Sequence, residues 1–176
     1  MRILWTTALA AALLPAAALA QEDGASPTAT ATLIDSEGNE AGQARLRETE
    51  GGFVHIVLTV EGVPEGIHGV HVHETGDCAT PDFQSAGGHI AGDAQHGFDS
   101  PEGVHPGDLP NAHVQSDGVL AVEYMNERLA MDESMLFDED GSAILVHEGP
   151  DDYVTDPAGD SGGRIFCGVI EEAAAE

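Results

Sequence analysis

The chain has 176 residues, a length typical of one domain with a sizeable hydrophobic core. Its 32 acidic residues stand against five arginines and no lysine, and the formal net charge at pH 7 is −27. A field of this sign excludes nucleic acid and anionic membrane surfaces as favourable partners. An enzyme with this charge that acts on an anion needs a local positive group to offset the field.

The first residues are typical of a secretory signal. Arg2 precedes the apolar run 3–14, and Ala18-Leu19-Ala20 has the small residues of a cleavage site, so we predict a signal peptide over residues 1–20. A membrane helix is the alternative, but the apolar run is too short and Pro15 interrupts it. We therefore expect a soluble product that is secreted or periplasmic and has no membrane anchor.

The polar segment 21–30 is rich in Ala, Thr and Ser, and we predict a flexible N-terminal segment there. We expect residues 31–176 to form one domain. In 53–61 the side chains alternate with a period of two, which indicates a strand with one buried face. The other runs that we interpret as strands are 31–35, 42–47, 67–74, 113–115, 119–126, 142–147 and 164–170.

Two stretches, 75–111 and 148–163, have no periodicity and are rich in Gly, Pro, Asp and Ser. Long irregular stretches inside a compact domain are commonly functional loops. Helical periodicity is not evident, although 126–135 is ambiguous. Short strands with Gly-rich turns predict an all-β sandwich or barrel with two long functional loops.

Cys78 and Cys167 are the two cysteines. In an oxidising compartment, two well-separated cysteines most simply form one intramolecular disulfide that closes a long loop. Two buried free thiols are the alternative, which export disfavours.

The sequence has nine histidines and only five arginines, which is an unusual ratio. His71 and His73 lie two apart in the strand-like run 67–74, so both imidazoles project from one face. Two adjacent imidazoles form a pair of nitrogen ligands for a transition metal. An H-x-H pattern alone is a weak signal, because exposed strand faces also collect histidine.

The long loop adds further ligands. His89, His96 and His105 are joined by Asp108, and three imidazoles with one carboxylate are a tetrahedral set suited to Zn²⁺. The remaining histidines on predicted strands, His71, His73 and His147, would form a second site with imidazole ligands only, which suits copper.

Five motifs occur in the order found in a known family. They are Gly69-Val70-His71-Val72-His73-Glu74, Ser85-Ala86-Gly87-Gly88-His89, His105-Pro106-Gly107-Asp108-Leu109-Pro110-Asn111, Leu145-Val146-His147-Glu148 and Gly163-Arg164-Ile165-Phe166-Cys167-Gly168-Val169-Ile170. On these residues the chain resembles a copper/zinc superoxide dismutase of the secreted bacterial, periplasmic type. The resemblance spans about residues 30–171 and implies an eight-stranded Greek-key β-barrel, an immunoglobulin-like sandwich.

The resemblance also implies a role for each matched residue. The copper ligands are His71, His73, His89 and His147, and the zinc ligands are His89, His96, His105 and Asp108. His89 thereby bridges both metals. The resemblance further implies a disulfide between Cys78 and Cys167, an arginine beside the copper at Arg164, and a carboxylate at Asp151 that links a copper histidine to a zinc histidine. We expect His68, on the opposite strand parity, to support the site, and His55 and His113 to be ordinary strand-surface residues.

Three features depart from the family pattern. Ile90-Ala91-Gly92-Asp93 stands where the family often has an aromatic residue followed by Asn-Pro. The spacing from His89 to His96 is tight. The segment 148–163 is short and has no lysine, whereas relatives use charged residues there to attract superoxide.

The activity that the resemblance implies is dismutation of superoxide to oxygen and hydrogen peroxide by cyclic Cu(II)/Cu(I) redox, with His89 and Arg164 as catalytic residues. The alternatives are a secreted copper- and zinc-binding module without turnover and a metal-free barrel that serves as an interaction domain. The resemblance also suggests a homodimer, since secreted bacterial relatives often pair through a barrel face.

Overall fold

The computed structural model describes residues 29–173, so the predicted signal peptide (1–20) and residues 21–28 of the predicted flexible segment lie outside the described part. Among the described residues, no helix is long and apolar enough to cross a membrane. The strands are β1 (Ala29–Asp35), β2 (Glu40–Glu48), β3 (Val54–Glu61), β4 (Gly66–His73), β5 (Asp108–Val114), β6 (Val119–Asn126), β7 (Ser142–His147) and β8 (Arg164–Glu172). A short 3₁₀ helix, η1 (Gln84–Ala86), lies in the first long loop.

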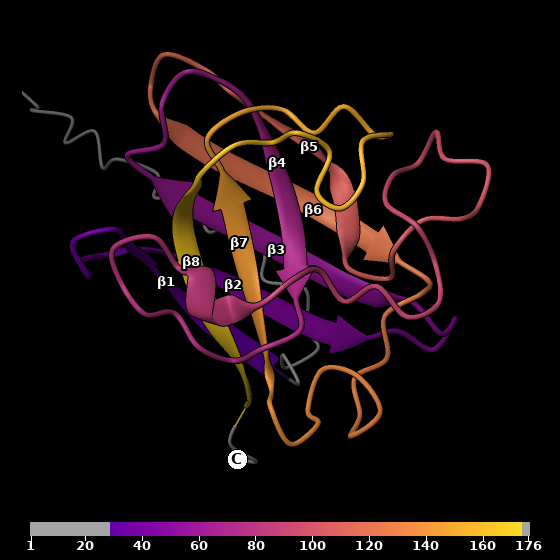
Figure 1. Ribbon diagram of the computed structural model, residues 1–176. Helices are drawn as coiled ribbons and strands as arrows, with labels where there is room; N and C mark the ends of the chain where they lie inside the picture. Colours follow the sequence, from indigo (N-terminus) through magenta and orange to yellow (C-terminus); the bar gives the residue numbers. More distant parts are fainter. Residues whose placement is uncertain (1–28, 174–176) are drawn as a thin grey trace, which may run out of the picture.

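The eight strands form one antiparallel sheet in the order β5-β4-β7-β8-β1-β2-β3-β6. The edge strands β5 and β6 lie alongside one another, so the sheet curls into a nearly closed barrel (Figure 1). The chain crosses between the two halves of the barrel from β3 to β4 and from β6 to β7. The predicted eight-stranded Greek-key β-barrel is therefore confirmed.

Alternation along the strands places apolar side chains inside the barrel. In β3, Ile56 is fully buried, whereas the next residue, Val57, is 40% exposed on the outer face. The largest fully buried side chains of the barrel interior include Leu33, Leu46, Leu58, Leu109, Leu120 and Ile144. Burial of apolar surface at about 25 cal/mol per Å² makes this interior the main source of stability.

Strands β4 and β7 differ from the others because they are buried on both faces. Every residue of β7 is buried, as are His68 to His73 of β4. The inward residues join the barrel interior, whereas outward Ala143 and Leu145 join a second, small cluster with Phe83, Ala86 and Cys167. The outer face of these strands therefore lies under a cover of loops.

The two long loops, 74–107 and 148–163, provide that cover and lie on the side of the barrel formed by β4, β7 and β8 (Figure 1). The Val72 N–H donates to the Gly107 carbonyl at 2.8 Å, and the Gly69 N–H donates to the Gly149 carbonyl at 2.8 Å. The second bond is available because the register of β4 with β5 shifts between His68 and Val70, which turns the Gly69 N–H towards the loop. Both loops are thus fixed to the strand that carries the H-x-H pair.

Three details differ from the expectations. β5 begins at Asp108, although the sequence predicts irregular structure up to residue 111, and β1 begins at Ala29, two residues earlier than expected. His55 is only 3% exposed and hydrogen-bonds Glu123, so the expectation of an ordinary surface residue is wrong. Its register neighbours Arg47 and Met125 flank it on the same face of the sheet. His113 is exposed, as expected.

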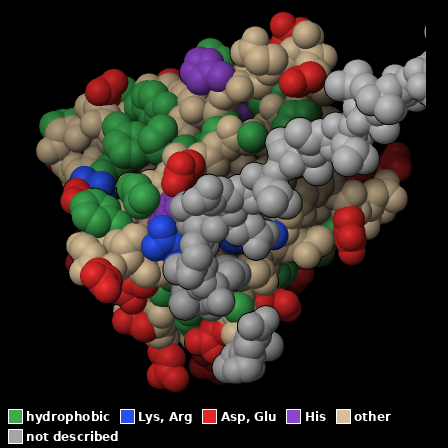
Figure 2. All heavy atoms as spheres, turned by 180° about the vertical axis from the view of Figure 1, so that it is seen from behind, with side chains coloured by type: hydrophobic (Ala, Val, Ile, Leu, Met, Phe, Trp, Pro, Cys, Tyr) green, Lys and Arg blue, Asp and Glu red, His purple; other side chains and the backbone are tan. Residues whose placement is uncertain are grey.

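Acidic side chains are spread over the surface seen from behind, with few basic groups between them (Figure 2). This distribution follows from the composition, since the sequence has 32 acidic residues and five basic ones. An anion approaching the molecule therefore meets a repulsive field over most of this face.

Candidate metal centre

Four buried imidazoles meet on the outer face of β4. His71 and His73 project from β4, His147 ends β7, and His89 comes from the first long loop, where it forms an isolated bridge with His73. The ring centroids of His71 and His89 are 3.9 Å apart, and those of His71 and His147 are 4.8 Å apart. One nitrogen from each ring lies within 4.8 Å of the others, so these residues form a group that could hold a metal ion. We call His71, His73, His89 and His147 the four-imidazole group.

Within residues 29–173, one nitrogen of each ring in this group is buried without a hydrogen-bond partner. These atoms are His71 Nδ1, His73 Nε2, His89 Nε2 and His147 Nε2. Buried polar atoms are almost always paired, so four unpaired nitrogens in one such group indicate a shared ligand. Four imidazole nitrogens are a suitable donor set for copper, and the residues present fit that ion.

The second nitrogen of each ring is held by the protein. His73 Nδ1 donates to the Gly87 carbonyl at 3.0 Å, and His147 Nδ1 lies 3.4 Å from the Gly162 carbonyl. His71 Nε2 donates to Asp151 Oδ2 at 2.8 Å. These contacts fix the orientation of each ring and leave the opposite nitrogen free to bind a metal.

A second group is centred on Asp108 at the start of β5. The Nδ1 atoms of His89, His96 and His105 lie 2.8, 3.1 and 3.4 Å from Asp108 Oδ1. Tetrahedral zinc with bonds of about 2.0–2.1 Å places neighbouring ligand atoms roughly 3.3 Å apart, so this spacing fits that ion. We call His89, His96, His105 and Asp108 the Asp108 group, and the atoms again lie within 4.8 Å of one another.

His89 belongs to both groups. Its Nδ1 faces Asp108, whereas its Nε2 is turned towards the four-imidazole group. Asp151 makes a second connection between the groups, since its Oδ2 accepts from His71 and its Oδ1 accepts from His96 Nε2 at 2.9 Å. The two groups are thus parts of one centre.

Burial and carboxylates set the protonation of these side chains. Burial lowers the pKa of His71 to about 4 and that of His147 to about 3, so both rings are neutral at pH 7 and have a lone pair to offer. Burial opposes protonation of His96 as well, but hydrogen bonds to Asp108 and Asp151 raise its pKa to about 9. Hydrogen bonds from His89 and His96 hold the pKa of Asp108 well below its usual range, although burial acts in the other direction.

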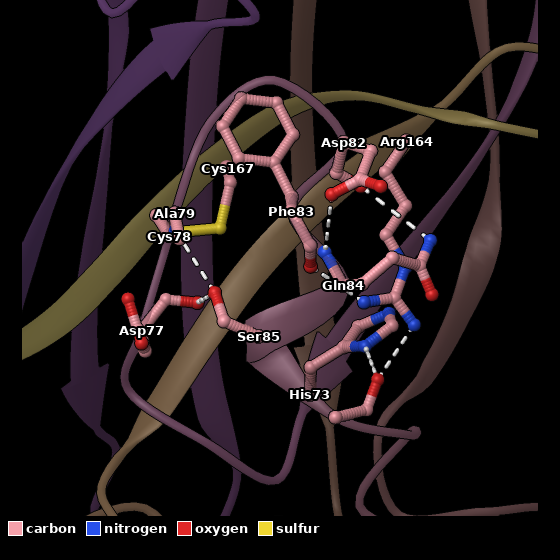
Figure 3. Close-up of a disulfide and its surroundings, with 11 residues drawn as sticks. His73, Asp77, Cys78, Ala79, Asp82, Phe83, Gln84, Ser85, Arg164 and Cys167 are labelled. Atoms are coloured by element: carbon pink, nitrogen blue, oxygen red, sulfur yellow. Dashed lines mark hydrogen bonds between the residues drawn. A yellow bond between two sulfur atoms is a disulfide. The ribbon is translucent and has the colours of Figure 1, made fainter.

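Arg164, the first residue of β8, lies beside the four-imidazole group. Its Nη1 donates to the Phe83 carbonyl and its Nη2 donates to the Gly87 carbonyl, each at 2.6 Å. The Gly87 carbonyl also accepts from His73 Nδ1, and Figure 3 shows both side chains meeting at this one oxygen. Two carbonyl contacts leave the remaining N–H groups of the guanidinium available for an anion.

The disulfide lies on the other side of Phe83 from this arginine (Figure 3). Cys78 and Cys167 are bonded, as the sequence suggests, and they close a loop of 89 residues (Figure 3). Phe83 is fully buried in the small cluster that contains Cys167, and its backbone has a left-handed φ of 55°. The disulfide and the Phe83 ring therefore fix the carbonyl that holds Arg164.

His68 contacts the centre without offering a nitrogen to either group. Its Nδ1 donates to the His147 carbonyl at 2.8 Å, and its Nε2 lies 2.9 Å from the Pro64 carbonyl. The ring thus supports the backbone of His147 at the end of β7.

Sequence reasoning missed the residues that act through their backbone or through a missing side chain. Phe83 and Gly87 contribute only carbonyl oxygens, which every residue has. Gly159 matters because it has no side chain: a Cβ built there would lie 1.9 Å from Asp151 Oδ1 and 2.6 Å from His96 Nε2. Asn111, whose amide contacts the Asp151 backbone, lies in the motif 105–111, but its residue type alone predicts no such contact.

Gly159→Ala is expected to weaken zinc binding by about 10–100-fold, because the new methyl group must displace the contact between Asp151 and His96. Competition with a chelating dye measures this change. Gly38→Ala is the matched control, since Gly38 also has a positive φ, +85°, but no atom lies within 4 Å of its Cβ position. Equal zinc affinities for the two variants would show that the packing at Gly159 is unimportant.

Comparison with known proteins gives a consistent result. The family model described as copper/zinc superoxide dismutase (SODC) matches residues 40–170. A superoxide dismutase [Cu-Zn] 2 of Aquifex aeolicus is 42% identical over 147 residues, which cover 81% of this chain and 85% of that protein. A superoxide dismutase [Cu-Zn] of Caulobacter vibrioides is 41% identical over 150 residues, covering 82% of this chain and 86% of the relative.

Solved structures agree with the sequence matches. A superoxide dismutase-like protein from Bacillus subtilis superposes with a TM-score of 0.75 at 37% identity, and the match covers 80% of this chain and 96% of that chain. A Cu/Zn superoxide dismutase from Brucella abortus superposes with a TM-score of 0.66 at 30% identity, covering 81% of this chain and 98% of the other. The chain therefore belongs to the copper/zinc superoxide dismutase family.

Proposed function

We propose that this chain is an enzyme that converts two superoxide ions and two protons into oxygen and hydrogen peroxide, with copper in the four-imidazole group and zinc in the Asp108 group. The observation that carries this proposal is the position of His89, whose two nitrogens face the two groups. The relatives from Aquifex aeolicus and Caulobacter vibrioides are described as superoxide dismutases, which supports the same reaction.

The relative from Bacillus subtilis is described only as superoxide dismutase-like, so support for the activity comes from the residues of the two groups. His71, His73, His89 and His147 would hold copper through nitrogens that no protein group pairs among the residues described. His96, His105 and Asp108 would hold zinc together with His89. Copper held in this way would supply one-electron redox chemistry between Cu(II) and Cu(I), which oxidation of one superoxide ion and reduction of the next both need.

Arg164 binds the substrate in this proposal. Its guanidinium is fixed by the Phe83 and Gly87 carbonyls and carries N–H groups that can donate charge-assisted hydrogen bonds to an anion. Because the net charge is −27, this local cation provides the attraction that the overall field does not.

His89 carries the proton in this proposal. Its Nε2 is buried and, among the described residues, has no hydrogen-bond partner, so whenever this nitrogen is not bound to copper it can hold a proton and donate it to peroxide. Contact of Nδ1 with the Asp108 group fixes the ring while the proton is transferred. Asp151 orients His71 and His96, whose rings both lie next to this ring.

We infer that the protein acts in the periplasm or outside the cell. The Cys78–Cys167 disulfide supports this location, because structural disulfides persist in oxidising compartments.

We also propose that the protein pairs as a homodimer through the outer face of β3 and β6. Val57 and Met125 on this face are 40% and 57% exposed, and Figure 2 shows hydrophobic side chains gathered on the surface seen from behind. Met125→Glu is expected to convert the dimer to a monomer, because a charge would be buried at the interface. Sedimentation velocity measures the change, and a wild type that sediments as a monomer at high concentration contradicts the proposal.

The assay for the main proposal compares one protein in two metal states. Protein that carries copper and zinc is expected to consume superoxide rapidly, whereas the same protein with zinc alone is expected to be inactive. Stopped-flow decay of superoxide measures the rate, and metal analysis of the same sample should give one copper and one zinc per chain. Tight binding of both metals without faster decay would instead favour a metal-binding module.

A further inference from the structure

Asp151, which connects His71 to His96, is unusually well fixed for a loop residue. The residue is 3% exposed, and its carboxylate accepts from both rings and also from the Tyr153 N–H at 2.6 Å. The position of the Asp151 carboxylate therefore determines the orientation of both the His71 ring and the His96 ring. The loop 148–163 has no regular structure, so a group outside regular strand pairing must hold the Asp151 backbone.

The holding group is the Asn111 side chain. Asn111 Oδ1 accepts from the Asp151 N–H at 2.8 Å, and Asn111 Nδ2 donates to the Asp151 carbonyl at 2.8 Å. The amide thus pairs with both backbone groups of Asp151 in the way a neighbouring strand would. Only a side chain with a donor and an acceptor on one short planar group can make this pair of contacts.

Asn111 is itself fixed in place. It lies on β5, three residues after Asp108, and its backbone N–H donates to the Tyr153 hydroxyl at 2.7 Å. The Tyr153 ring packs edge-on against Phe98, with centroids 5.5 Å apart, and Phe98 belongs to the first long loop. β5 therefore holds the first loop through Asp108 and the second loop through Asn111.

We propose that Asn111 is a positioning residue that sets the Asp151 carboxylate between the two metal groups. The inference rests on the proposed ligand roles of His71 and His96, although not on turnover. Without the Asn111 amide, the Asp151 backbone must find water or other partners, and its carboxylate loses its fixed place between the two rings. The His71 and His96 rings then lose the contact that orients their metal-binding Nδ1 atoms.

The test uses full-length protein loaded with zinc. Asn111→Ala removes both contacts to Asp151, and Asn111→Asp keeps the size and the acceptor but replaces the donor with a second acceptor that faces the Asp151 carbonyl. Nuclear magnetic resonance of the imidazole N–H protons reports on the rings directly. The His73 Nδ1–H, which donates to the Gly87 carbonyl, provides an internal reference in the same spectrum.

In both variants, we expect the Nε2–H protons of His71 and His96 to exchange with water at least about tenfold faster, because their acceptor is no longer fixed. The His73 proton should change by less than twofold. Zinc release to a chelator should accelerate by about tenfold, at the lower end of the range for groups that orient ligands. Asn39→Ala is the matched control, since Asn39 holds only the turn at Asp35 and should change none of these readouts.

Unchanged exchange at His71 and His96 would overturn the proposal, and so would equal acceleration of all three protons. If Asn111→Ala fails to fold, the isosteric Asn111→Asp decides by the same criteria. None of these readouts involves superoxide, so a protein that binds zinc but dismutes nothing would refute the proposed function and leave this inference intact.

Discussion

Replacing Arg164 with glutamate is expected to reduce the rate constant for superoxide consumption by about 10²–10³-fold, the range found when a preorganised donor to a reacting oxyanion is removed. The variant loses the cation that the Phe83 and Gly87 carbonyls hold beside the four-imidazole group. It also places a further negative charge on a chain whose net charge is already −27. Stopped-flow decay of superoxide at matched copper content measures the change.

Salt dependence distinguishes local docking from overall charge. Screening weakens repulsion, so the rate of Arg164→Glu should rise with ionic strength as the Debye length falls to about 10 Å and below. Arg128→Glu is the matched control, because it changes the net charge equally at an exposed site, where Arg128 pairs with Glu127. We expect its rate to remain within about twofold of the wild type, since exposed surface charges contribute little interaction energy. Similar losses in both variants would mean that overall charge, and not local docking, governs the reaction.

Removing the disulfide should have the largest effect on stability. The bond closes a loop of 89 residues, for which the chain-entropy relation gives about 4–5 kcal/mol at 25 °C. For a domain of this size, that loss corresponds to a fall in Tm of about 10–20 °C. The double variant Cys78→Ser, Cys167→Ala is suitable, because Cys167 is fully buried in the small cluster with Phe83.

Urea unfolding of the metal-free protein measures this loss without contributions from metal binding. Reduction of the wild-type protein should give the same decrease, because it opens the same loop without changing any other side chain. A decrease below about 1 kcal/mol would contradict the entropic account. The same variant should also bind anions more weakly, since the Phe83 carbonyl loses part of its support under Arg164.

The fold was largely predictable because its strands alternate in the expected way. The exception is the start of β5, where Asp108, Pro110 and Asn111 do not resemble a strand. Proline is tolerated there because β5 is an edge strand and Pro110 is exposed. His55 was misread for a related reason, since alternation assigns it to the outer face and cannot show that Glu123 from β6 binds it.

The centre was predictable only as far as side-chain type carries information. Histidines and one carboxylate at these spacings indicate metal ligands, and the structure brings His71, His73, His89, His96, His105, Asp108 and His147 into two adjoining groups. In the structure, Asp151 contacts His71 and His96, and Arg164 shares the Gly87 carbonyl with His73. Gly159 and the Phe83 and Gly87 carbonyls could not be predicted, because their roles depend on backbone geometry and on space that only the folded chain defines.

The central claim is that the His89 imidazole joins the two metal groups. Electron paramagnetic resonance of protein with Cu(II) in the four-imidazole group and Co(II) in the Asp108 group tests it most directly, because a shared ring transmits magnetic exchange between the two ions. We expect the copper signal to be lost with cobalt present and to return when zinc takes its place. A full-intensity signal of isolated Cu(II) with both metals bound would contradict the account.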